Sequence, residues 1–174
     1  DKVFLTWLVD GTQFTYRDTW ERSLRIAGGL RAAGIKRGKH VAVLSDNRPE
    51  VIFVHIALAL LGAVCVPVNT AARGDLLRHL LAHPDAEVLI AENEHLPHVE
   101  AIHAGVPALK RLVTLDGMGG AADHWDFRTD YAHVAAGPDL AHDATNPRFS
   151  ELAAIFYTSG TTGPAKGVMF THAR

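Results

Sequence analysis

Short, almost entirely apolar runs recur along the chain, and a helical pattern separates most of them from one another. They lie at Val41 to Leu44, Val64 to Val66, Ala86 to Ala91, Arg111 to Leu115 and Glu151 to Thr158. Strands without polar alternation are buried on both faces, as in parallel sheets covered by helices. The sequence therefore predicts an α/β fold, with a mostly parallel sheet flanked by helices. A chain of 174 residues is long enough for one domain with a proper core.

Three helices are expected, one before the first of these runs and two between them. The first begins at about Asp18, which has capping-box spacing to Glu21. One face of it carries Trp20, Leu24, Ala27 and Leu30. The third begins at about Gly74 and ends before Pro84, with an apolar stripe of Leu76, Leu77, Leu80 and Leu81. A weaker helical pattern follows near Pro97 to Ala104.

The second helix lies in the longest apolar run, Val51 to Val68, which is interrupted only by His55. Its length reaches the lower limit for a membrane-spanning helix, roughly 17 residues. Gly62 and Pro67 interrupt it, however. We therefore expect a buried helix over about Pro49 to Leu61, a glycine C-cap at Gly62 and a short strand after it, with no membrane span.

The segment 116–150 has little periodicity. It contains glycines, prolines and short polar residues, which indicates a long irregular connection. One short helix is expected within it, in the stretch "FRTDYAHVAA" from Phe127 to Ala136.

Composition excludes two classes of partner. The net charge is -2, and the Lys and Arg residues are scattered, which argues against binding of nucleic acid or an anionic membrane. Cys65 is the single cysteine, so an internal disulfide is impossible and a reducing compartment, the cytoplasm, is expected. In its apolar surroundings Cys65 is interpreted as a core residue rather than a nucleophile.

The stretch "YTSGTTGPAKGV", Tyr157 to Val168, follows the last apolar run directly. Glycines let successive backbone N–H groups curl around an anion, and hydroxyls add further donors. Lys166 adds a mobile positive charge. We therefore predict a phosphate-binding loop over 158–167, in preference to an ordinary surface turn.

This loop is not a Walker loop of the form G-x-x-x-x-G-K-[ST]. When Gly160 and Lys166 are aligned with it, Ala165 stands at the second glycine and Gly167 at the Mg²⁺-binding hydroxyl. The residues after Lys166, "GVMFTH", favour a strand, whereas a Walker loop opens a helix.

The loop closely resembles the signature motif of the adenylate-forming, AMP-binding enzyme superfamily, which includes acyl-CoA synthetases, aryl-CoA ligases, luciferases and peptide-synthetase adenylation domains. The resemblance extends to the N-terminal region, where Gly62, Ala63, Pro67 and Asn69 match the element G-A-x-x-x-P-x-N. "VPVN" and "SDNRPEVIF" are more similar to acyl-CoA ligases, particularly the crotonobetaine/carnitine-CoA type. One departure is the order Pro164-Ala165-Lys166, since proline more often precedes the lysine directly.

The resemblance implies that ATP and a small carboxylic acid react to an acyl-adenylate and pyrophosphate, and that coenzyme A then takes the acyl group. It implies phosphate binding by Thr158, Ser159, Gly160, Thr161, Thr162 and Gly163. It also implies that Lys166 neutralises the departing pyrophosphate and that Thr158 lies near Mg²⁺. Donors placed where charge develops would stabilise the transition state.

The family's adenine and ribose motifs, acyl pocket, hinge and C-terminal lysine have no counterpart in residues 1–174. The resemblance therefore implies a partial N-terminal AMP-binding domain whose parent chain continues beyond Arg174, and 1–174 alone is expected to be inactive. The alternative is a non-catalytic nucleotide-binding or interaction module that has kept the loop without the chemistry.

Other titratable residues give weaker signals. His79 and His83 have the i, i+4 spacing of a zinc pair but no evident third ligand, so they are interpreted as partly exposed helix histidines. Asp46 and Glu50 flank a helix start and are interpreted as charges that complement its dipole. His95 and the histidines after it are too dispersed to indicate a catalytic base.

Overall fold

The computed structural model describes residues 2–119, 123–140, 147–158 and 164–173. Its main sheet has seven strands in the order β7-β6-β5-β3-β4-β8-β9, and the pairings are parallel except that of β8 with β9. The strands are β3 (His40–Leu44), β4 (Val64–Val68), β5 (Val88–Ala91), β6 (Arg111–Thr114), β7 (Phe127–Asp130), β8 (Leu152–Thr158) and β9 (Lys166–Thr171). The predicted α/β class and all five predicted strands are confirmed.

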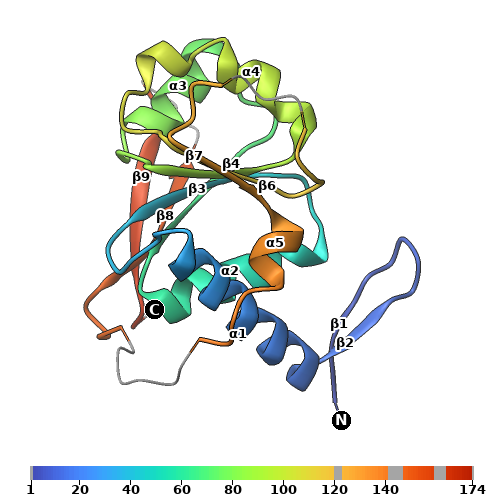
Figure 1. The fold of residues 1–174 in the computed structure, drawn as a ribbon. Helices are drawn as coiled ribbons and strands as arrows, with labels where there is room; N and C mark the ends of the chain where they lie inside the picture. The colour runs from blue at the N-terminus through green and yellow to red at the C-terminus, as the bar shows by residue number, and fades with distance from the viewer. Residues whose placement is uncertain (1, 120–122, 141–146, 159–163, 174) are drawn as a thin grey trace.

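Helices cover both faces of this sheet (Figure 1). One face carries α1 (Tyr16–Ala32), α2 (Pro49–Leu61) and α5 (Tyr131–Ala135), and the other carries α3 (Gly74–Ala82) and α4 (Leu96–Glu100). Two 3₁₀ turns, Asn93–His95 and His103–Gly105, flank α4. Alternate residues of β5 enter different cores: Ile90 packs with α1 and α2, whereas Leu89 packs with α3 and α4. Burial on both faces explains why the strands are apolar throughout.

The run Val51 to Val68 folds as the sequence predicts. Helix α2 ends at Leu61, and Gly62 takes the left-handed conformation with φ 65°, which a residue without a Cβ adopts most readily. Strand β4 follows directly and extends to Val68, two residues beyond the predicted end. In the described part of the chain, no helix has the length and apolar character needed to span a bilayer.

The first helix begins earlier than predicted. Thr15 is its N-cap: Thr15 Oγ1 accepts a hydrogen bond from the Asp18 amide, and the Asp18 carboxylate accepts one from the Thr15 amide. The capping box is therefore Thr15 with Asp18 rather than Asp18 with Glu21. Before it, β1 (Val3–Thr6) and β2 (Gln13–Thr15) form a separate antiparallel ribbon that projects from the body (Figure 1).

The buried faces of two helices also differ from the predicted stripes. Trp20 is 45% exposed, because the face of α1 toward the core is made by Thr19, Ser23, Ile26, Ala27 and Leu30. Leu76 is 50% exposed, whereas Leu77, Leu80 and Leu81 are buried. In both helices the predicted stripe was one residue too wide on the N-terminal side.

Two adjacent glycines allow α1 to lie against α5 and the residues after it. A Cβ on Gly29 would stand 2.0 Å from the Val134 carbonyl oxygen, and a Cβ on Gly28 would stand 1.7 Å from that of Pro138. Both distances are far shorter than a van der Waals contact. The contacted atoms belong to the backbone, which cannot rotate away as the end of a side chain can. Close packing at this crossing therefore depends on the absence of side chains.

Within 116–150, the short helix expected over Phe127 to Ala136 is present only as α5. The first four of these residues form strand β7 instead, which the sequence did not predict. This strand pairs in parallel with β6 at the edge of the sheet. Among its residues only Thr129 is fully buried. An edge strand of four polar or half-buried residues carries little of the apolar signal by which the other strands were found.

Candidate functional site

The phosphate-loop motif connects two antiparallel strands, β8 and β9. Thr158, the last residue of β8, lies directly across from Lys166, the first residue of β9. Both are exposed. Thr158, for which the resemblance implies a place near Mg²⁺, and Lys166, for which it implies contact with pyrophosphate, therefore lie opposite each other at the base of the loop. Ser159, Gly160, Thr161, Thr162 and Gly163 lie outside the described residues.

Pairing of β8 with β4 fixes where this base lies in the fold. The two strands run parallel, with Cys65 opposite Ala154, so β8 ends at the same edge of the sheet as the other parallel strands. The carboxyl edge is where open α/β sheets bind ligands. Because Lys166 begins a strand rather than a helix, the exclusion of a Walker loop was correct.

Two histidines contact the two ends of the loop: His79 in helix α3 and His83, the C-cap of that helix. His79 Nε2 lies 2.8 Å from the Ala165 carbonyl oxygen, and His83 Nδ1 lies 2.7 Å from the Tyr157 hydroxyl. Since a carbonyl only accepts, His79 donates through Nε2. The interpretation of these histidines as partly exposed helix residues is confirmed, but it did not include their partners: each contacts the residue next to Thr158 or Lys166. Their i, i+4 spacing was the available signal, but it gave no indication of the partners.

Tyr157 forms the middle of this cluster. Its ring packs edge-on against both imidazoles, with ring centroids 5.9 Å apart in each case. Burial raises the pKa of its hydroxyl, so the phenol stays protonated at neutral pH and carries no charge toward the loop. On the opposite strand, a Cβ on Gly167 would approach the Ile155 side chain to 2.8 Å and the Tyr157 ring to 3.3 Å. The base of the loop is therefore closely packed.

We expect His79→Phe to loosen the start of β9. The variant keeps an aromatic ring but loses the hydrogen bond to Ala165, a contact worth about 1 kcal/mol. Amide hydrogen exchange of Lys166 and Val168 should become about fivefold faster. His98→Phe, a change to a half-buried histidine of α4, is the matched control and should leave these amides unchanged. Unaltered exchange in His79→Phe would show that the bond does not hold the strand.

The other candidates singled out from the sequence are structural or lie elsewhere. Burial raises the pKa of the Cys65 thiol to about 12, so it is no nucleophile at neutral pH. Glu50 lies in the first turn of α2, as expected. Burial opposes its ionisation, but hydrogen bonding and charge from Arg48 lower its pKa overall. Asp46 and His95, interpreted separately from the sequence, lie together at the ends of β3 and β5.

The comparison with protein families agrees with this geometry. The family described as AMP-binding enzyme matches residues 1–174. The chain belongs to the AMP-binding enzyme family. The resemblance inferred from the loop and from the G-A-x-x-x-P-x-N element is thus confirmed.

Relatives similar to this chain include proteins named as CoA synthases and CoA ligases. A feruloyl-CoA synthase of Amycolatopsis is 36% identical over 162 residues, which cover 93% of this chain and 29% of that protein. A crotonobetaine/carnitine–CoA ligase of Proteus mirabilis is 31% identical over 163 residues, covering 92% and 31%. The chain therefore spans about 30% of the length of these relatives.

Solved AMP-binding structures share the fold. The anthranilate CoA ligase AuaEII, solved with anthranoyl-AMP, has a TM-score of 0.80 and 25% identity, covering 92% of this chain and 30% of that one. The N-terminal domain of FACL13 from Mycobacterium tuberculosis has a TM-score of 0.76 and 28% identity, covering 94% and 39%. Both therefore share the overall fold of this chain.

Proposed function

We propose that the chain is the N-terminal part of a longer, ATP-dependent carboxylate–CoA ligase. The parent enzyme activates a carboxylic acid as an acyl-adenylate, releases pyrophosphate and transfers the acyl group to coenzyme A. The observation that carries the proposal is the signature loop at the carboxyl end of β8, with Thr158 opposite Lys166. The names of relatives such as feruloyl-CoA synthase, long-chain-fatty-acid–CoA ligase and crotonobetaine/carnitine–CoA ligase support the same chemistry.

In this proposal the loop holds the phosphates of ATP. Ser159, Gly160, Thr161, Thr162 and Gly163 supply hydroxyl and backbone donors, and Thr158 and Lys166 stand at the two ends. The exposed Lys166 ammonium has no acidic partner among the described residues, so its charge is free to follow the departing pyrophosphate. Mg²⁺, when bound near Thr158, would screen phosphate oxygens from the incoming carboxylate.

The names of the relatives indicate several classes of carboxylic acid as substrates of the parent enzyme. The relatives include enzymes named for an aryl acid, for long-chain fatty acids and for a betaine, so substrates in aromatic-acid or fatty-acid metabolism are both consistent with the family. A cytoplasmic location is proposed on the single buried, reduced Cys65.

Exchange of labelled pyrophosphate into ATP tests the reaction. We expect the full-length protein to catalyse exchange that depends on an added acid, screened over aryl, short-chain and long-chain acids and carnitine-like betaines. It should then form the corresponding CoA thioester. Residues 1–174 alone should give none. ATP binding by the full-length protein, without exchange for any acid, would favour the alternative of a non-catalytic nucleotide-binding module.

A further inference from the structure

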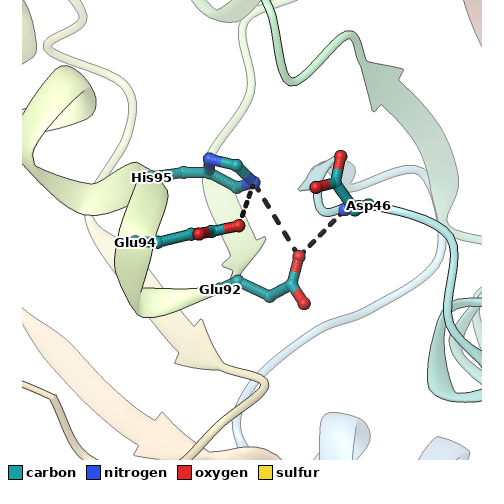
Figure 2. Close-up of side chains that lie close together, drawn as sticks. All are labelled: Asp46, Glu92, Glu94 and His95. Atoms are coloured by element: carbon teal, nitrogen blue, oxygen red, sulfur yellow. Dashed lines mark hydrogen bonds and ion pairs between the residues drawn. The ribbon is translucent and has the colours of Figure 1, made fainter.

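A second group of polar side chains lies at the carboxyl edge of the sheet, between the ends of neighbouring strands β3 and β5. It consists of Asp46, Glu92, Glu94 and His95, and one ligand atom from each lies within 4.8 Å of the others (Figure 2). Asp46 follows β3, and the other three follow β5. We propose that these four residues bind a divalent transition-metal ion of the zinc class.

The buried imidazole is the observation that points to a ligand. His95 is 6% exposed, and its Nε2 has no hydrogen-bond partner among the described residues. Figure 2 shows this nitrogen directed at the carboxylates of Glu94 and Glu92. A buried ring nitrogen without a partner costs free energy, and a cation bound at this point would remove that cost.

Distances favour a metal ion over a proton between these groups. His95 Nε2 is 3.6 Å from Glu94 Oε1 and 3.8 Å from Glu92 Oε2, and a hydrogen bond from a protonated ring would bring an acceptor to about 2.8 Å. Two ligands of one tetrahedral zinc ion, each about 2.0 to 2.1 Å from it, stand about 3.3 Å apart. The observed separations are close to that value.

Glu92 can bind an ion with the loss of a single contact, the hydrogen bond from Ser45. Glu92 Oε1 accepts from Arg48 at 2.9 Å, whereas Oε2 accepts from the Asp46 amide at 2.9 Å and from Ser45 Oγ at 3.0 Å. The Ser45 hydroxyl has a second acceptor, the Asp46 carbonyl oxygen at 3.0 Å. It can therefore release Glu92 Oε2 to the metal.

Charge and ligand type indicate the class of ion. Three carboxylates face one guanidinium, Arg48, which is also paired with Glu50, so the group has an excess of negative charge that a divalent cation would offset. An imidazole among oxygen ligands favours zinc-class ions over Mg²⁺ or Ca²⁺, which prefer oxygen alone. Because the ligands come from two loops, the ion would join the end of β3 to the start of α4.

Equilibrium dialysis of the metal-stripped full-length protein against Zn²⁺ tests the site. The chain has 11 histidines, so the measured quantity is the difference between variants. Wild type should bind one Zn²⁺ more tightly than Glu94→Gln and Asp46→Asn by at least about tenfold. Glu21→Gln, an exposed change on α1, should match wild type, and Mg²⁺ should not compete.

A second readout shows where the ion binds. At a fixed Zn²⁺ concentration, Zn²⁺ should shift the ¹⁵N resonance of His95 Nε2 and raise the melting temperature of wild type, and it should do both to a much smaller extent in Glu94→Gln, which keeps the imidazole. Equal Zn²⁺ binding by wild type and the two carboxylate variants would overturn the proposal, as would an unshifted His95 resonance. These outcomes do not depend on ligase activity, so the site can fail while the proposed function stands.

Discussion

Lys166→Ala in the full-length enzyme should lower the rate of carboxylate-dependent pyrophosphate exchange by about 10² to 10³, equivalent to about 3 to 4 kcal/mol. The physical reason is that negative charge on the leaving pyrophosphate grows in the transition state, where the ammonium acts most strongly. The effect should therefore fall on kcat more than on KM for ATP. The position of Lys166 opposite Thr158, exposed at the base of the loop, is consistent with this role.

Lys110→Ala is the matched control for the lysine. Lys110 is also exposed, and it pairs with Asp126 at 3.7 Å. The two residues precede β6 and β7, at the other end of the strand order from β8 and β9. Its removal should leave exchange within twofold of wild type, since exposed pairs contribute little. Full activity in Lys166→Ala would contradict the assignment of the loop, and an equal fall in both variants would indicate a general effect of charge.

Gly29→Ala should destabilise the protein by about 3 kcal/mol, although helix propensity alone would predict a gain of about 1 kcal/mol. The added methyl group would stand 2.0 Å from the Val134 carbonyl oxygen. Relief requires α5 to move away from α1, which would also disturb the buried Val134 side chain. The free energy of unfolding, measured in urea on the full-length protein, shows directly whether Gly29→Ala stabilises or destabilises the protein.

Arg25→Ala serves as the control on the same helix, because Arg25 is exposed and its replacement should change stability by less than 0.5 kcal/mol. The more severe Gly29→Val should destabilise further than Gly29→Ala. A stabilised Gly29→Ala would mean that α1 and α5 are separated in solution and that the close crossing is incorrect.

Elements whose residues are buried on two sides could be predicted from the sequence, because their composition has no polar alternation. Strand β5 and helix α2 are the clearest cases, and α2 was predicted to the residue because Pro49 and Gly62 mark its ends. Strand β7 was not predicted, since an edge strand with one fully buried residue has no such signature.

For the candidate site, the motif identified Thr158 and Lys166 but not their surroundings. The hydrogen bonds of His79 and His83 cross from α3 to residues far along the chain, and nothing local in "RHLLAH" encodes that pairing. The grouping of Asp46 with His95 has the same origin: adjacency of β3 and β5 in the sheet brings together residues that the sequence separates.

The order of the strands in the sheet also affects how the chain folds. Strands β3 to β6 pair with near neighbours in the sequence, but β7 and β8 are separated in the sheet by β6, β5, β3 and β4. Strand β8 pairs instead with β4, which lies far from it in the sequence. Forming such a contact is slow, because chain entropy is lost before the contact forms. Until β8 arrives, the apolar strand β4 is an open edge, which can template pairing with another chain. Strand β8, which leads into the loop, is thus also the strand that covers the edge of β4. Before β8 has paired, we expect aggregation during synthesis to begin at β4.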